Sequence, residues 1–416
     1  MIAIGRRIHL KNSIWVERNT ILYLTGTFTY KLGDKIFVLA IPWLIYEITQ
    51  SSVSMGTMFL LQTLPYIFIS PLAGRLADHF SQKTLLILCA IIQGWLVSLI
   101  PVLSITNALQ IWNIYLIGFL IACFNASFSV VNSTMIPLLF RKDKLLKINS
   151  FYQFIDTSSV LFGSILGGFL ISKIGVYYVL LLAGSAFIPI IFSTIFLRIY
   201  DEIVLNRKKK ALSLNHFFEG VSFLFQHPLL RALTLLILMV NIANGALISM
   251  LVYFSRDKLL LNSEQLGLVY GVAAAAQIAA IFLVNFLSNG KNTLQLMMIN
   301  LVISSLGFIW ISISWNVFTL LIGVAIQSAP VIMFNVLNRT LRQKIIPLYM
   351  FGRVNGIMIM LMQCALPLSG FMTGMLSAII DIRYIFALLG ALSFIVIYLF
   401  RSLPAKQQES YKILSS

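Results

Sequence analysis

The sequence predicts an all-α integral membrane protein with twelve transmembrane helices in two pseudo-symmetric six-helix bundles. Its 416 residues are 59% hydrophobic and only 10% charged, which lies far outside the composition of a soluble domain. Apolar runs of about 20 residues, the length that a helix needs to cross a bilayer, recur along the chain between short polar joints. One longer, basic joint divides these runs into six and six.

The predicted spans follow this alternation in order. In the first half they lie at 19–46, 53–77, 84–103, 109–139, 149–171 and 176–197. In the second half they lie at 229–254, 265–287, 294–313, 317–337, 354–376 and 384–399. The predicted organisation is an N-terminal segment (1–18), a first bundle (19–199), a linker with an amphipathic helix on the inner leaflet (200–228), a second bundle (229–402) and a tail (403–416).

The basic residues predict the orientation of these spans. The net charge is +17, and most Lys and Arg residues fall in alternate joints, as they do on the cytoplasmic side of membrane proteins. Both termini are therefore predicted to be cytoplasmic. The same charge in a soluble protein would suggest nucleic acid, but a topological role accounts for its distribution here, so no nucleic-acid partner is expected.

Three charged residues stand together inside the first span, at Lys31, Asp34 and Lys35. A charge at the centre of a bilayer costs about 2.5–3.5 kcal/mol on insertion scales, so such residues face a cavity or pair with one another. Spacings of three and four place Lys31 on the same helix face as both other residues, and Asp34 can neutralise one lysine. Either a structural ion pair or a role in substrate or proton coupling fits this pattern.

Asp156 is a second carboxylate within a span, the fifth. Such a group can load and release a proton near neutral pH, because burial disfavours its charged form. A hydrogen bond from a serine or asparagine on a neighbouring helix is the alternative explanation for it. Asp156 therefore joins Lys31, Asp34 and Lys35 as a candidate for substrate or proton coupling.

The joint between the second and third spans carries a dense polar pattern, Gly74-Arg-Leu-Ala-Asp-His-Phe-Ser-Gln-Lys83. Gly74 allows two helices to approach closely. Asp78 is expected at the start of the third helix, where a carboxylate can cap free backbone N–H groups and lies at the positive end of the helix dipole. This joint is therefore predicted to lie where two membrane helices meet water.

This joint resembles the signature of the major facilitator superfamily, Gly-x-Leu-Ala-Asp-(Arg/Lys)-x-Gly-(Arg/Lys)-(Arg/Lys). The matching residues are Gly74, Leu76, Ala77, Asp78 and Lys83, while His79, Ser81 and Gln82 depart from the pattern. The resemblance implies a gating motif in which Asp78 binds the N-terminal end of the eleventh helix at Arg353. It also implies alternating access by two bundles.

Other stretches are similar to the bacterial drug, macrolide and siderophore efflux branch of this family. The fifth span carries Gly163-Ser-Ile-Leu-Gly167-Gly168, which resembles the glycine-rich motif of antiporters apart from Ser164 at its proline position. The resemblance implies proton-coupled efflux of a small amphipathic molecule across a bacterial plasma membrane. Import of a solute by symport, lipid transport by the same fold and a non-transporting membrane sensor remain alternatives.

No pattern of catalytic or metal-binding residues is expected. Cys89, Cys123 and Cys364 lie in apolar runs without the spacing of a zinc site, and no phosphate-binding glycine loop is present. We therefore expect no enzyme activity, no cofactor and no metal, with a proton gradient as the driving force. The expected partners are a small amphipathic substrate and membrane lipid, around a monomeric protein.

Overall fold

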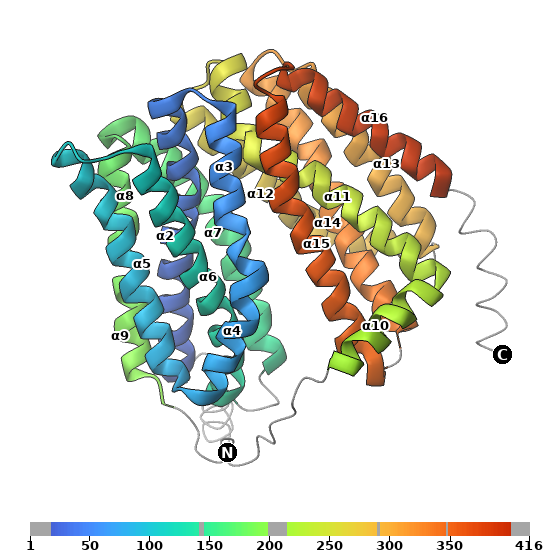
Figure 1. The fold of residues 1–416 in the computed structure, drawn as a ribbon, viewed down its shortest axis with the longest axis horizontal. Coiled ribbons are helices and arrows are strands. Elements are labelled where there is room, and N and C mark those ends of the chain that lie inside the picture. Colours follow the sequence, from blue (N-terminus) through green and yellow to red (C-terminus); the bar gives the residue numbers. More distant parts are fainter. Residues whose placement is uncertain (1–17, 141–144, 199–213, 289–291, 347, 401–416) are drawn as a thin grey trace, which may run out of the picture. The chain divides into compact units, whose positions relative to one another are not determined.

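Every regular element in the part of the chain described here is helical. The computed structural model describes residues 18–140, 145–198, 214–288, 292–346 and 348–400 (Figure 1). Within these ranges, nine helical segments are long and apolar enough to cross a membrane, and 360–376 and 382–395 are shorter apolar segments. Together with α2 they form twelve spans, which confirms the predicted fold class.

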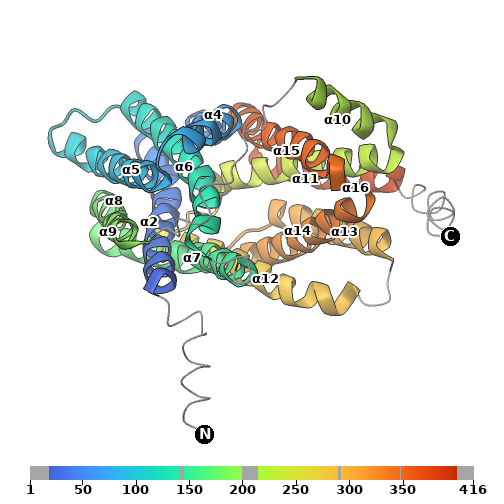
Figure 2. The same ribbon diagram turned by 90° about the horizontal axis from the view of Figure 1, so that it is seen from below.

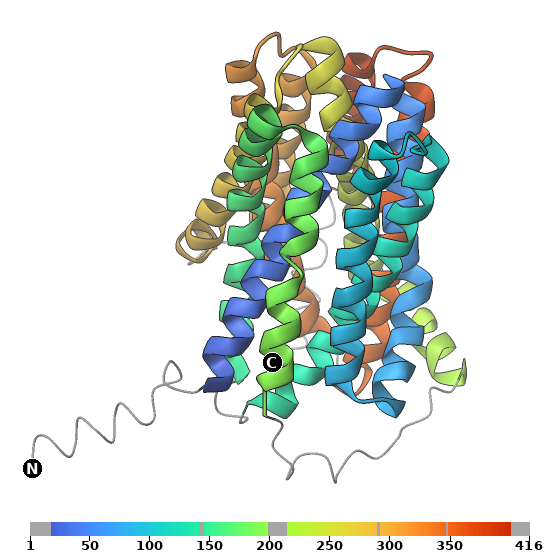
Figure 3. The same cartoon turned by 90° about the vertical axis from the view of Figure 1, so that its left-hand side faces the viewer.

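The first six spans contain eight helices, because two of the spans are broken. The helices are α2 (Arg18–Thr49), α3 (Ser52–Thr63), α4 (Pro65–His79), α5 (Gln82–Ile105), α6 (Ile111–Leu139), α7 (Leu145–Ile174), α8 (Val176–Ser185) and α9 (Ile188–Phe196). Figure 3 shows α8 and α9 following one another along a single span. Pro65 is the first residue of α4 and Pro189 the second residue of α9, and a proline suits a first helical turn because its missing N–H needs no partner there.

A short helix, α10, precedes the last six spans in the chain. The helices are α10 (Leu214–Gln226), α11 (Pro228–Tyr253), α12 (Ser263–Ser288), α13 (Thr293–Ser312), α14 (Val317–Ile345), α15 (Leu348–Leu376) and α16 (Ile382–Phe400), with a π-helical turn η4 (Phe254–Lys258) after α11. Single-turn π-helices often occur at functional sites.

The chain forms two compact units. The first contains Met1–Leu44 and Leu61–Lys209, and the second contains Ile45–Leu60 and Lys210–Ser416. The predicted boundary between the first bundle and the linker falls in residues 199–213, which lie outside the described part of the chain. The boundary at 199/200 therefore stays a prediction, as do the other predicted domain boundaries.

One end of the first unit is held together by polar side chains that bind free backbone groups. Asn19 Nδ2 donates to the Arg198 carbonyl at 2.7 Å, and Asn19 Oδ1 accepts from the Arg198 N–H at 3.0 Å. Lys83 Nζ donates to the carbonyls of Ile195 and Leu197 at 3.0 and 2.9 Å. A lysine is favourable there, because the last carbonyls of a helix lack intrahelical partners and carry a partial negative charge.

Helix α10 packs against the core of the second unit. Its Leu224 is buried in an apolar cluster with residues of α11, α13, α14 and α15, and Val221 and Phe223 pack against that cluster. Phe225 on the same helix is exposed. The predicted amphipathic helix therefore exists, but protein rather than lipid covers Leu224.

An ion cluster joins η4 to the turn before α16 in the second unit. Lys258 Nζ lies 3.3 Å from Asp257 Oδ2 and 3.1 Å from Asp381 Oδ2. The hydroxyl of Tyr46 donates to Asp257 at 3.3 Å. Burial acts to raise the pKa of Asp381, but the Arg383 backbone N–H and the Lys258 ammonium outweigh it, so that pKa lies below its usual range.

We expect Asp381→Asn to lower thermal stability slightly at neutral pH. The loss should stay below about 1 kcal/mol, because the Asp381 side chain is 34% exposed and solvent screens the pair. A carboxylate with a lowered pKa stabilises the fold above its unfolded pKa and loses this contribution as the pH falls through the folded pKa. The difference in unfolding temperature between wild type and variant should therefore begin to shrink below about pH 4 and vanish only once the pH falls below the lowered pKa of folded Asp381. A difference that grows under acid would contradict this assignment.

Candidate functional site

The charged residues of α2 form two ion pairs within the first unit. Lys31 Nζ lies 2.9 Å from Asp156 Oδ1 on α7, and Lys35 Nζ lies 3.1 Å from Asp34 Oδ2 on α2 itself. The structure therefore brings together all four residues that the sequence singled out for substrate or proton coupling. Such pairing is expected, because a charge buried in a low-dielectric interior is costly unless an opposite charge lies beside it.

Asp34 is the more enclosed of the two carboxylates. Its residue is 4% exposed, and its second oxygen, Oδ1, accepts a hydrogen bond from Asn125 Nδ2 on α6 at 2.8 Å. Both oxygens of Asp34 therefore have partners. A change in the charge of this group must disturb α6 as well as α2.

Tyr30 extends the network from Asn125 to α5. Its hydroxyl lies 3.0 Å from Gln93 Oε1 and 3.1 Å from Asn125 Oδ1, so one proton serves two acceptors. The Tyr30 ring stacks on Phe128 with centroids 3.8 Å apart. The Nε2 group of Gln93 is buried without a hydrogen-bond partner among the described residues. Gln93 and Tyr30 were missed by the sequence analysis, because a lone Tyr or Gln in a span carries no distinctive signal.

Glycines on α7 explain how it approaches α2 closely enough to form the Lys31–Asp156 pair. A Cβ at Gly163 would lie 2.8 Å from Cβ of Lys35, and one at Gly167 would lie 3.2 Å from Cδ2 of Leu39. Gly168 is buried beside them. Figure 2 shows α2 among α6, α7 and α8 of the first unit, viewed from below. The glycine motif that resembles that of antiporters thus lies at the contact between the two helices that carry the ion pairs.

We expect Gly163→Leu to lower the free energy of unfolding by about 1–3 kcal/mol, because the added side chain must push α7 away from Lys35. The same displacement separates Lys31 from Asp156, so the ion pair between them should be lost as well. Thermal unfolding of the purified protein measures the first effect. Leu166→Ile is the matched control, because Leu166 lies on the same helix and is 43% exposed. Equal unfolding temperatures for the two variants would disprove the close contact.

The gating motif is only partly visible. The structure describes the helical backbone at Gly74, Asp78 and Arg353 but not the surroundings of these residues, so the predicted contact between Asp78 and Arg353 stays a prediction. Leu76 is exposed, and Lys83 binds the C-terminal carbonyls of α9. The expected cap was wrong: α4 continues to His79, so Asp78 lies in its last turn, and Ser81 is the N-cap residue of α5.

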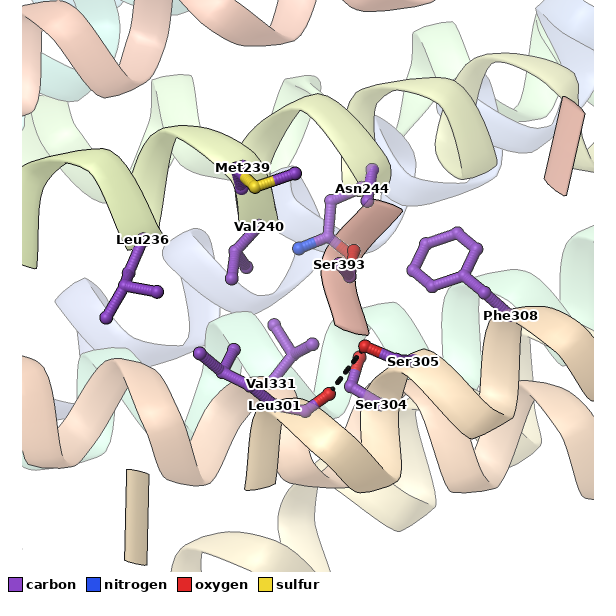
Figure 4. Close-up of a pocket in the computed structure, with 11 residues that line it drawn as sticks. Leu236, Met239, Val240, Asn244, Leu301, Ser304, Ser305, Phe308, Val331 and Ser393 are labelled. Carbon is purple, nitrogen blue, oxygen red and sulfur yellow. Dashed lines mark hydrogen bonds between the residues drawn. The ribbon is translucent and has the colours of Figure 1, made fainter. Parts of the chain in front are cut away.

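Two amide side chains form a hydrogen bond in the interior of the second unit. Gln327 Nε2 on α14 donates to Asn244 Oδ1 on α11 at 2.8 Å. Figure 4 shows a small pocket beside this pair, lined by apolar side chains together with Asn244, Ser304, Ser305 and Ser393. The Ser305 hydroxyl donates back to the Leu301 carbonyl at 2.8 Å. The charges of α2 and α7 thus have no counterpart among the residues that line this pocket.

No metal centre is found in the described ranges, where no three His, Cys, Asp or Glu residues lie close enough to hold an ion. The free thiols Cys89, Cys123 and Cys364 lie apart in three different spans. The geometry is therefore that of a buried ion-pair network and offers groups that can bind ions or protons.

Relatives in sequence include transporters from bacteria. The chain is 27% identical over 204 residues to the uncharacterized MFS-type transporter YfiS of Bacillus subtilis, covering 48% of this chain and 47% of that protein. It is 23% identical over 225 residues to the multidrug efflux pump Tap of Mycolicibacterium fortuitum, covering 52% and 54%. The chain therefore spans about half the length of the curated relatives it matches.

Solved structures share the fold over nearly the whole chain. The nucleoside transporter NupG matches with a TM-score of 0.72 and 14% identity, covering 92% of this chain and 98% of that one. A bacterial homologue of the human lysosomal transporter Spinster matches with a TM-score of 0.66 and 14% identity, covering 93% and 95%. The family model for the Major Facilitator Superfamily matches residues 23–365 and 233–413. This chain is thus a multi-pass membrane protein and belongs to the Major Facilitator Superfamily.

Proposed function

We propose that this transporter exports a small amphipathic molecule in exchange for protons. The observation that supports this proposal is that two carboxylates within the predicted spans, Asp34 and Asp156, are each neutralised by a lysine of α2. We further propose that it works as a monomer in a bacterial plasma membrane with both termini in the cytoplasm. Lipid surrounds it, and a proton gradient supplies the energy without a cofactor.

Proton binding at these carboxylates has a direct structural consequence. A proton on Asp34 removes the negative charge that holds Lys35, and a proton on Asp156 does the same for Lys31. An unpaired lysine ammonium is unstable in the membrane interior and must find water or another anion. Each protonation therefore favours a different arrangement of α2 relative to α6 and α7, which is how an ion gradient can drive a conformational cycle.

Export is favoured by the similarity to a protein named as a multidrug efflux pump. The neutral, largely apolar pocket of the second unit also suits amphipathic compounds better than strongly polar ones. One observation favours a second candidate, import of a polar solute by symport, because the first unit contains four charged side chains that could bind such a solute.

Inside-out membrane vesicles distinguish these functions. With an imposed pH gradient, acid inside, an exporter that exchanges substrate for protons should accumulate its compound, and collapse of the gradient should abolish accumulation. A panel of hydrophobic drugs and siderophores provides the probes. Accumulation that is independent of the gradient would contradict proton exchange, and gradient-driven uptake only in right-side-out vesicles would favour symport.

A further inference from the structure

The ammonium of Lys31 lies in a site built from α7. It is 2.9 Å from Asp156 Oδ1 and 5.4 Å from the centre of the Tyr152 ring. Tyr152 and Asp156 are four residues apart on one helix, so their side chains share a face. A carboxylate beside an aromatic face is an arrangement that binds organic cations. Lys31, which comes from α2, is at present the cation in this site.

The Lys31–Asp156 pair is the more exchangeable of the two ion pairs. The Asp156 side chain is 31% exposed, whereas the Asp34 side chain is 6% exposed and both of its oxygens are held by Lys35 and Asn125. Lysine is also a point charge on a flexible four-carbon chain, so its ammonium leaves a carboxylate more readily than a rigid, bidentate group would. A molecule that reaches this network therefore competes for Asp156 rather than for Asp34.

Charge balance decides which molecules can compete. A monovalent cation that replaces the Lys31 ammonium leaves Asp156 neutralised, and the displaced ammonium can reach water at the end of its long side chain. An anion must instead bind Lys31 and leave Asp156 without a partner, and the short aspartate side chain cannot reach water in the same way, which is costly inside the membrane. The aromatic wall at Tyr152 adds to the preference for a cation with apolar groups, because ring faces attract positive charge.

We propose that Asp156 and Tyr152 form a binding site for lipophilic monovalent cations, such as protonated amines, and that Lys31 occupies this site until such a cation displaces it. This inference rests on the proposed transport of an amphipathic compound and names its substrate class. Lys31 is then an internal competitor. The apparent affinity of the site for the cation falls in proportion to the fraction of time that Lys31 leaves the site free.

Equilibrium binding to the purified full chain tests the proposal with two probes of the same shape and opposite charge, tetraphenylphosphonium and tetraphenylborate. Lys31→Met removes the competitor, so tetraphenylphosphonium should bind roughly tenfold more tightly than to wild type. Tyr152→Leu retains the ion pair and removes the aromatic wall, so binding should weaken roughly fivefold to tenfold. Tetraphenylborate should bind wild type more weakly than the cation does.

Lys173→Met is the matched control, because Lys173 is another lysine of the first unit, on α7, whose Nζ lies 5.7 Å from the centre of the Phe169 ring. It should leave binding unchanged. Unchanged or weaker binding by a folded Lys31→Met variant, or unchanged binding by Tyr152→Leu, would overturn the proposal. Should Lys31→Met fail to fold, Tyr152→Leu decides alone. No gradient is present in this assay, so a failure of proton-driven export would contradict the proposed function without altering this result.

Discussion

Asp34→Asn is expected to lower the initial rate of proton-driven accumulation in inside-out vesicles about 100-fold. Asparagine can still accept the hydrogen bond from Asn125 at Oδ1, but it can neither carry a proton nor neutralise Lys35. Removing one partner of a buried ion pair costs about 3–5 kcal/mol. A roughly 100-fold lower rate is expected when most of this cost raises the free-energy barrier of the transport cycle, since each 1.4 kcal/mol corresponds to about a factor of ten. Measured rates across external pH should lose their dependence on the gradient.

Asp381→Asn provides the control for this prediction. It makes the same substitution at another aspartate that pairs with a lysine, Lys258. Asp381 lies in the second unit, outside the α2 network. It should retain gradient-driven accumulation. Proton coupling through the α2 network would be wrong if Asp34→Asn and Asp156→Asn both transported normally at every external pH.

Much of the fold was predictable from the sequence because membrane spans must be continuous apolar helices. The start and end of α11 and α13, for example, differ from the predicted ranges by only one residue each. The breaks within the second and sixth spans were not predicted, although Pro65 and Pro189 mark the helices that follow them. A proline inside an apolar run can start, kink or end a helix, and only packing decides between these outcomes.

The pairing within α2 was partly predictable, whereas its link to α7 was not. Neighbouring charges on one helix left Asp34 with few possible partners, and the expectation that it neutralises a lysine is confirmed by the contact with Lys35. Asp156 was instead considered with a serine or asparagine partner. Its pairing with Lys31 depends on the approach of two helices far apart in sequence, for which Gly163 and Gly167 were the available signal.

Amphipathicity alone also left the environment of α10 open. An apolar helix face can be covered by lipid or by protein, and the same sequence pattern is compatible with both environments. The structure places Leu224 in the protein core and leaves Phe225 exposed on the same helix. The error at Asp78 has a different origin: the turn between α4 and α5 is only two residues long, which moves the cap position to Ser81.

Stability of Lys31 and Asp156 variants should be strongly non-additive. A fully buried pair loses about 3–5 kcal/mol when one partner is removed, and the 31% exposure of Asp156 reduces the expected loss here to about 2 kcal/mol for Lys31→Met or for Asp156→Leu. The double variant replaces both charges by apolar side chains and leaves no uncompensated charge. It should therefore recover to within about 1 kcal/mol of wild type, a coupling within the range measured for residues in contact.

Chemical unfolding of the four proteins in detergent measures this cycle, and vesicle transport gives its functional counterpart. Lys173→Met should have little effect on stability, because Lys173 is exposed. The double variant should fold well and yet fail in proton-driven transport, because it lacks a carboxylate that the proposed cycle uses. Recovery of stability without recovery of transport would show that the pair is retained for its chemistry, since the fold does not need it. Additive losses of stability would instead mean that Lys31 and Asp156 contribute separately, and the ion pair would then not couple α2 to α7.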